Sequence, residues 1–380
     1  MKKHKSLTLV AAFLFSVAAV AQIPNGYYDG TQDLEGFELK TKLFQIIGNF
    51  NAQSYNDLKD LYKSTHPTNG FRDRYYEMDN TVLDVYSENP DGTDPYNYNP
   101  NSQMGSGANE GSAFNREHLI PQSYFNQALP MRADAFHVWP VDSKVNGWRG
   151  NDAIGPVDNP QNANPCNNGA TNHPCKSKNG TLKGKFGSTT VLEPIDEFKG
   201  DIARAFLYFA TAYENKLPNF YNNSAGVKAM FDGSKNKAFS DKFLNVLIEW
   251  HLQDPPSQRE IDLNDMIQYR FQGNRNPYID HPEFASRIWG IGLNTEDLEF
   301  QSRPDVEVYY AANKEVVIRL LNDEKSMDKI SVYDASGKLV QAHLNKMNQK
   351  EFRLNIQQKG VYILKIEGKR LEFNSKLMIR

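Results

Sequence analysis

The sequence predicts an α+β protein in which a mainly helical, loop-rich domain at 22–300 is followed by a small all-β sandwich domain at 301–380. Apolar residues recur at helical spacing at 34–50 and 200–215, and a further helical block lies at about 240–272. After the third block the pattern changes to short β-rich runs roughly ten residues apart, with the turn signals DASG and QQKG between them. This change of pattern indicates the domain boundary.

The first two helical stretches each carry an apolar face, which we expect to face the core. In the first stretch this face holds Phe37, Leu39, Leu43, Ile46 and Ile47. In the second it holds Ile202, Ala205, Phe206, Phe209 and Ala210.

The third helical block has two halves that meet at DPPSQRE. The paired prolines stop the first half, and Ser257 and Glu260 have the spacing of a capping box, in which the serine caps the next helix. Residues 141–199, before the second helix, are predicted to be rich in loops.

Residues 1–21 have the layout of a secretory signal peptide: a basic stub, about a dozen apolar residues and the small-residue pattern AVA before Gln22. The apolar run is too short to span a bilayer, and nothing later approaches the roughly 18 to 20 apolar residues that a membrane helix needs. We therefore expect an exported soluble protein without a stable membrane span.

Composition excludes few classes of protein. The chain has 380 residues, 39% of them apolar, and a formal net charge of -3. This charge argues against a protein that coats nucleic acid with a basic surface, although a local basic cleft is compatible with a near-neutral total.

The two cysteines, Cys166 and Cys175, lie in the short polar segment NPCNNGATNHPC. In an exported chain we expect a disulfide that closes this loop. A metal site that includes His173 is the alternative, which the absence of a second cysteine pair disfavours.

The stretch FNREHLIPQSYF at 114–125 places the carboxylate of Glu117 next to the imidazole of His118. The following segment, 129–155, concentrates oxygen donors, one more histidine and an arginine on a loop-like stretch with two glycines. Its candidate side chains are Asp134, His137, Asp142, Asn146, Arg149 and Asn151. Such hard oxygen ligands suit Mg²⁺ or Ca²⁺ better than a structural zinc ion.

These residue types match the needs of phosphodiester hydrolysis. That reaction requires a base for the attacking water, a cation for the phosphate oxygens and a positive group that stabilises the product. An imidazole, a carboxylate with an amide oxygen, and an arginine fork can supply these three roles. His137 is flanked by apolar residues, which favours a buried structural histidine over a ligand.

The two motifs FNREHLIPQSYF and MRADAFHVWPVDSKVNGWRGN resemble the endonuclease I family of secreted and periplasmic bacterial nucleases. The likeness continues through EPIDEFKGDIARAFLYFATAY, WHLQDPPSQRE and QGNRNPYIDHPEFASRIW, so that it covers most of residues 30–290. The resemblance implies an active site built on a ββα-metal finger within the helical, loop-rich domain.

Transferred to this sequence, the family's roles make His118 the general base and Glu117 and Asn146 the ligands of one Mg²⁺, with Ca²⁺ or Mn²⁺ as alternatives. Arg149 and Arg116 are candidates for phosphate contact. The expected function is a secreted, non-specific endonuclease for DNA, with RNA as a further substrate. A secreted ribonuclease with the same site and a catalytically silent surface-binding protein are the alternatives, and we expect a monomer.

The last 75 or so residues, with KISVYDASGKLV, GVYILKI and the terminal SKLMIR, resemble the C-terminal sorting domain of type IX secretion cargo. This resemblance implies secretion machinery as a partner and a location outside the cell or on its surface. An accessory β-sandwich that binds a surface or a ligand is the alternative.

Overall fold

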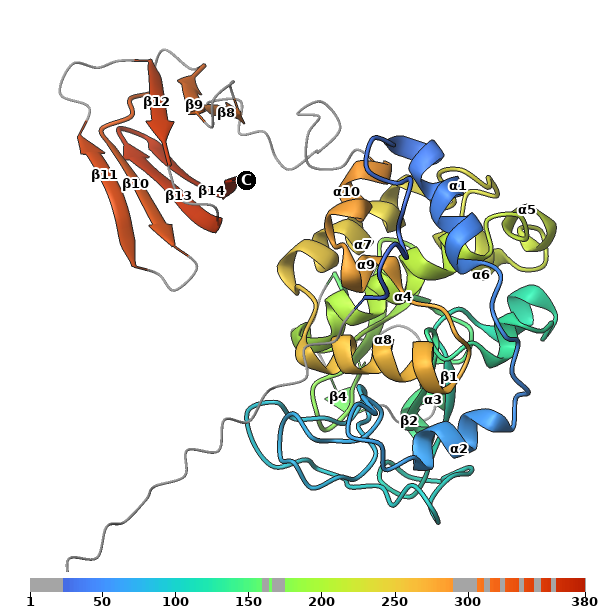
Figure 1. Ribbon diagram of the computed structural model, residues 1–380. Helices are drawn as coiled ribbons and strands as arrows, with labels where there is room; N and C mark the ends of the chain where they lie inside the picture. Colours follow the sequence, from blue (N-terminus) through green and yellow to red (C-terminus); the bar gives the residue numbers. More distant parts are fainter. Residues whose placement is uncertain are drawn as a thin grey trace, which may run out of the picture. The chain divides into compact units, whose positions relative to one another are not determined.

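The computed structural model describes residues 23–158, 164–165, 175–289, 306–310, 315–321, 325–334, 338–344, 350–356 and 360–379. The chain forms two compact units, residues 1–290 and 291–380 (Figure 1). The expected signal peptide and the expected domain boundary near residue 300 lie outside the described residues.

The first unit is mixed α+β, as the sequence predicts. Its helices are α1 (Gly36–Ile47), α2 (Asp57–Lys63), α3 (Ser143–Arg149), α4 (Lys199–Ala212), α5 (Leu217–Phe220), α6 (Ala225–Met230), α7 (Asp241–Gln253), α8 (Gln258–Arg270), α9 (Pro277–Asp280) and α10 (Glu283–Trp289).

Helix α4 is the centre of this unit. Every residue from Gly200 to Ala212 is buried, and the helix packs against α7, α1 and α9. A helix that is buried on all sides belongs to the core of its domain. The five apolar positions predicted to face the core are among these residues.

The prediction for α1 is confirmed at three of the five positions. Leu39, Leu43 and Ile47 are fully buried, whereas Ile46 is half-buried and Phe37 is 38% exposed. The helix begins only at Gly36, so Phe37 lies in the first turn and on the solvent side of the buried stripe.

The predicted break between α7 and α8 and its capping box are confirmed. Ser257 accepts a hydrogen bond from the backbone N–H of Glu260, and the Glu260 carboxylate accepts one from the N–H of Ser257 at 3.0 Å.

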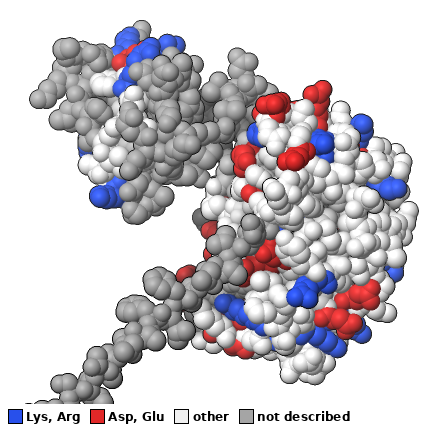
Figure 2. Space-filling model, viewed as in Figure 1, with Lys and Arg blue, Asp and Glu red and all other residues white. Residues whose placement is uncertain are grey.

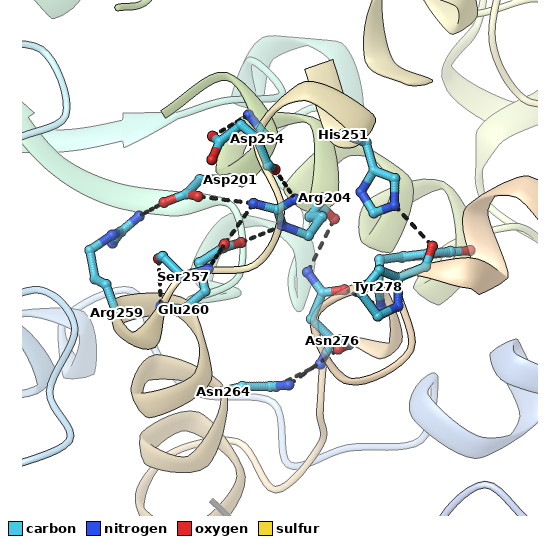
Figure 3. A network of polar contacts seen from close by, with 12 residues as sticks. Asp201, Arg204, His251, Asp254, Ser257, Arg259, Glu260, Asn264, Asn276 and Tyr278 are labelled. Atoms are coloured by element: carbon cyan, nitrogen blue, oxygen red, sulfur yellow. Dashed lines mark hydrogen bonds and ion pairs between the residues drawn. The ribbon is translucent and has the colours of Figure 1, made fainter. Parts of the chain in front are cut away.

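A buried network of charges joins α4 to the beginning of α8 (Figure 3). Asp201 pairs with Arg204 at 3.1 Å and with Arg259 at 2.5 Å, and Arg204 pairs with Glu260 at 2.6 Å. Arg204 also donates to the carbonyl oxygen of Asp254, at the end of α7. Since each charge is buried with a partner, the network fixes the relative positions of three helices.

Two antiparallel strands, β1 (Phe114–His118) and β2 (Val138–Asp142), form a separate small sheet in which Glu117 pairs with Trp139 and His118 with Val138. Helix α3 follows β2 without an intervening loop.

A five-stranded sheet of order β3-β7-β6-β5-β4 occupies much of the segment that was predicted to be loop-rich. Its strands are β3 (Ala153–Ile154), β4 (Asn164–Pro165), β5 (Cys175–Lys176), β6 (Leu182–Phe186) and β7 (Thr189–Glu193). The expected disulfide is outside the described residues, because Cys166 and the side chain of Cys175 are not described.

The second unit is β-rich, as predicted. One sheet has the order β11-β10-β13-β14 and the other β12-β9-β8, and their buried residues form one hydrophobic cluster. The strands are β8 (Val306–Tyr310), β9 (Glu315–Leu320), β10 (Lys329–Asp334), β11 (Leu339–Leu344), β12 (Glu351–Asn355), β13 (Gly360–Gly368) and β14 (Leu371–Ile379).

Among the described residues, no helix combines the length and the apolar character needed to cross a membrane.

The charge network gives a prediction for stability. Asp201→Ala leaves Arg259 buried without its carboxylate partner, so we expect the free energy of unfolding to fall by about 3–5 kcal/mol in denaturant titrations. Glu249→Ala, at an exposed position of α7, should change it by no more than about 0.5 kcal/mol. Equal effects of the two substitutions would contradict a stabilising role of the network.

Candidate active site

The strand β1 presents Glu117 and His118 in succession, so their side chains lie on opposite faces of the strand. Both are nearly buried, with 2% and 5% of their surfaces exposed. Glu117 faces α3, where it meets Arg149, and His118 faces the loop that carries Arg132.

Asp142 fixes the start of α3. Its Oδ1 accepts hydrogen bonds from the backbone N–H groups of Lys144 at 2.7 Å and Val145 at 2.9 Å, which is a helix N-cap. Its Oδ2 accepts from the Tyr98 hydroxyl and from the N–H of Gly111. Asp142 therefore caps the first turn of α3 through one oxygen and connects it, through the other oxygen, to the segment before β1.

Asn146 lies one turn into α3, beside β1. Its Nδ2 donates to Oδ1 of Asn115 at 2.6 Å and more weakly to the carbonyl oxygen of Arg116 at 3.4 Å. These bonds orient the amide and leave Oδ1 of Asn146 without a partner among the described residues.

The Glu117 carboxylate is held through one oxygen only. Its Oε1 accepts hydrogen bonds from the Tyr86 hydroxyl at 2.8 Å and from Nη1 of Arg149 at 2.7 Å. Burial raises the pKa of Glu117, while Arg149 and Tyr86 oppose this rise. No side chain of the described residues donates to Oε2, although the backbone N–H of His118 also interacts with the carboxylate, so Oε2 can bind another group.

Arg149 joins α3 to β1. Besides Glu117, its guanidinium donates to the carbonyl oxygens of His118 and Leu119, each at 2.6 Å, and of Asp152 at 2.9 Å. Its side chain is wholly buried. These contacts favour a role in positioning Glu117 over the phosphate contact expected from the sequence.

His118 is arranged as a neutral base. Its Nε2 lies 3.1 Å from the carbonyl oxygen of Arg132, which can only accept, so Nε2 carries the proton and Nδ1 the free lone pair. Burial lowers the pKa of His118 to about 3, and His137 adds to this effect. The ring also stacks on Tyr55, with centroids 5.7 Å apart.

Two half-buried arginines lie beside this base. The guanidinium of Arg116 is 3.6 Å and that of Arg132 is 4.4 Å from the centre of the Tyr55 ring. Each uses one nitrogen for a hydrogen bond, Arg116 to the carbonyl oxygen of Tyr55 and Arg132 to Gln122. Their other nitrogens have no partner among the described residues, so both can contact an anion.

Two further candidates from the sequence, His137 and Asp134, have structural roles. His137 is fully buried and hydrogen bonds the carbonyl oxygen of Met131 at 2.7 Å. Asp134 accepts hydrogen bonds from Tyr208, Tyr213 and Gln272, which ties the loop before β2 to α4.

Three contributors to the site carry no local sequence signal. Tyr55 and Tyr86 lie in irregular segments well before β1. Arg132 lies in the motif MRADAFHVWPVDSKVNGWRGN, but its position in that motif indicates no role. Only the tertiary structure brings them to Glu117 and His118.

The oxygen donors fit a Mg²⁺ ion. Oε2 of Glu117 and Oδ1 of Asn146 are hard oxygen donors that bind no other side chain within the described part of the chain. Mg²⁺ is usually held by one or two carboxylates while it keeps several waters. On the face shown in Figure 2, acidic and basic side chains are interspersed without a continuous patch of either sign.

Comparison with known proteins identifies the families to which the two units are similar. Residues 35–283 match the Endonuclease I family, and residues 312–380 match the Secretion system C-terminal sorting domain. The extracellular ribonuclease of Bacillus subtilis is 30% identical over 267 residues, which cover 69% of this chain and 78% of the relative. That of Bacillus amyloliquefaciens is 29% identical over the same length and coverage.

The fold, the site and these relatives define a nuclease, an enzyme that hydrolyses phosphodiester bonds and is secreted or displayed on the cell surface. The chain belongs to the Endonuclease I family and carries a type IX sorting domain at its C-terminal end.

The contact between Tyr86 and Glu117 can be tested directly. Tyr86→Phe removes one hydrogen bond from the carboxylate, so we expect kcat/KM to fall by about 10–100-fold and the metal concentration at half-maximal activity to change. Tyr278→Phe, which loses a comparable buried hydrogen bond to Thr211, should leave the metal dependence unchanged. Unaltered metal titrations in both variants would show that Tyr86 does not position Glu117.

Proposed function

We propose that this protein is an exported, Mg²⁺-dependent endonuclease of low sequence specificity. In this proposal β1, β2 and α3 form a ββα-metal finger, His118 is the general base, and Glu117 and Asn146 hold the metal, for which Ca²⁺ or Mn²⁺ could substitute. The observation that carries the proposal is the neutral, buried His118 with a free Nδ1, next in the chain to a carboxylate with a free Oε2.

His118 would act through its Nδ1. This nitrogen takes a proton from the attacking water, and the Arg132 carbonyl then stabilises the imidazolium through its hydrogen bond to Nε2. When bound, Mg²⁺ supplies positive charge for the phosphate and leaving-group oxygens. Because the pKa of His118 lies well below neutral, the base is unprotonated throughout the physiological range.

Arg116 and Arg132 are the proposed phosphate contacts. Both stack against Tyr55, which limits their freedom, and both keep donors for an anion beside His118. Arg149 would act indirectly, by holding Glu117 and the backbone of His118.

We propose that the substrate includes both DNA and RNA. A water molecule activated by His118 needs no 2′-hydroxyl, and contacts to phosphates carry no base information. The two Bacillus relatives are named extracellular ribonucleases, which supports RNA as a substrate and keeps a dedicated ribonuclease as the second candidate.

The remaining features complete the proposed organisation. We propose a catalytic domain at 22–300 and a sorting domain at 301–380, preceded by a signal peptide at 1–21. The sorting domain would engage the secretion machinery. We propose that the enzyme is a monomer, and a dimer in size-exclusion chromatography with light scattering would contradict this proposal.

The role of His118 makes the sharpest prediction. His118→Ala should lower kcat by about 10²–10⁴-fold, because the attacking water loses its base, while the far-ultraviolet circular dichroism spectrum stays unchanged. His66→Ala, which touches no site residue, should keep full activity. Near-normal cleavage by folded His118→Ala protein would refute the mechanism, whereas a lack of cleavage by the unaltered protein would favour the catalytically silent surface-binding protein.

The proposed nucleophile predicts the products. DNA and RNA of the same sequence should both be cut, and RNA products should lack 2′,3′-cyclic phosphate ends, because water rather than the 2′-hydroxyl attacks. Mass spectrometry of the products decides this. Intact DNA alongside cleaved RNA would support the dedicated ribonuclease, and cyclic phosphate ends would exclude the proposed nucleophile.

The phosphate contacts predict a change in salt dependence. Arg116→Gln and Arg132→Gln should each reduce the slope of log affinity for duplex DNA against log salt concentration by about 0.9, the loss expected for one phosphate contact. Lys216→Gln, at an exposed position that contacts no site residue, should leave the slope unchanged. Slopes that stay constant in both arginine variants would exclude these contacts.

A further inference from the structure

Residues 64–113, between α2 and β1, contain no helix or strand, apart from isolated bridges such as Arg72 to Val82. Segments longer than about 12–15 residues without regular structure are uncommon in compact domains. Much of this segment is nevertheless buried, including Asp84, Tyr86 and Glu88. Contacts other than a helix or sheet must therefore hold it in place.

Three carboxylates converge within this segment. Asp73, Glu77 and Glu88 each offer an oxygen, and these oxygens lie within 4.8 Å of one another. Glu88 is fully buried and Asp73 is 1% exposed. Oδ1 of Asp73 accepts hydrogen bonds from the backbone N–H groups of Tyr75 and Tyr76, which leaves its Oδ2 for another partner.

These carboxylates lack the partners that buried charges need. Among the described residues, no N–H or O–H group donates to Oδ2 of Asp73 or to the side-chain oxygens of Glu77 and Glu88. The carboxyl of Asp94 can hydrogen bond Glu88 only when one of these two groups is protonated. Within the described part of the chain, no lysine or arginine pairs with any of the three. A buried carboxylate without a partner is strongly unfavourable, so a group of three requires a counter-charge.

The pKa values of these carboxyl groups show the same conflict. Burial raises the pKa of Glu88 to about 10, and the negative charges of Asp94, Asp73 and Glu77 raise it further. Burial also raises the pKa of Asp94, which lies close by, to about 6. A bound cation would lower these pKa values, because it stabilises the ionised carboxylates.

From the convergence and burial of these oxygens, we infer that Asp73, Glu77 and Glu88 bind a Ca²⁺ ion that stabilises residues 64–113. The donors are all hard oxygens, which suit Ca²⁺. Oxygens on opposite sides of a Ca²⁺ ion are about 4.6–5.2 Å apart, so atoms within 4.8 Å of one another fit around one ion. This site is separate from the proposed catalytic metal at Glu117 and Asn146.

The Ca²⁺ site is connected to the active site through a short stretch of chain. Glu88 lies two residues after Tyr86, whose hydroxyl donates to Glu117, and four residues after Asp84. Asp84 accepts a hydrogen bond at 2.8 Å from the N–H of Asp142, the cap of α3. An ion that fixes Glu88 would therefore also order the groups that position Glu117 and α3.

Thermal unfolding of the full chain tests this inference after removal of bound metal with a chelator. Addition of millimolar Ca²⁺ should raise Tm by several degrees, about 3–8 °C, because the ion binds only the folded state. Glu88→Gln should lose most of this rise, and only a contribution from Ca²⁺ at the proposed catalytic site should remain. Asp91→Asn, an exposed position of the same segment with the same change in charge, should keep it, as should Asn146→Ala.

A second measurement applies if Glu88→Gln fails to fold. Tb³⁺ bound at the site should emit when Tyr75 or Tyr76 is excited, and Ca²⁺ should displace it in both the unaltered chain and Asn146→Ala. The inference is overturned if Ca²⁺ leaves Tm unchanged, if Glu88→Gln keeps the full rise, or if Asn146→Ala abolishes either the rise or the Tb³⁺ emission. The last result would place the Ca²⁺ response at the catalytic site.

Discussion

The buried ion pair between Arg149 and Glu117 is the interaction on which the site depends. Arg149 is the last residue of α3, and its guanidinium reaches both the Glu117 carboxylate and the backbone carbonyls of His118 and Leu119. Loss of either partner would leave a buried charge unpaired, at a cost of about 3–5 kcal/mol. One side chain therefore fixes the helix that carries Asn146 to the strand that carries the other two proposed catalytic groups.

The same contact explains how adjacent residues can have different chemical roles. Oε1 of Glu117 is occupied by Arg149 and Tyr86, which leaves Oε2 available on the side of the proposed metal. His118, on the other face of β1, is desolvated and bound through Nε2, so it stays neutral with Nδ1 free. Burial disfavours the charged form of each side chain when that side chain has no partner. Here it keeps His118 neutral as the proposed base, while the ion pair with Arg149 keeps Glu117 available as the proposed metal ligand.

The parts of the fold that could be predicted are those with local signals. Helical periodicity predicted α1 and α4, and the prolines with Ser257 and Glu260 predicted the boundary between α7 and α8. The hairpin of β6 and β7 was missed, because its residues alternate only weakly between apolar and polar. For the proposed site, the residue types and the family motif suggested Glu117, His118 and Asn146. Tyr55, Tyr86 and the buried position of Arg149 depend on contacts between distant segments, which no local pattern encodes.

In the proposed site, Glu117 and Asn146 bind the metal while His118 stays free to act as the base. Crystals grown with Mn²⁺ and measured at the manganese absorption edge would locate the ion directly. We expect an anomalous peak in contact with Oε2 of Glu117 and Oδ1 of Asn146, with Nδ1 of His118 outside its coordination sphere. A peak that contacts neither oxygen, or one that is coordinated by His118, would contradict the proposed site.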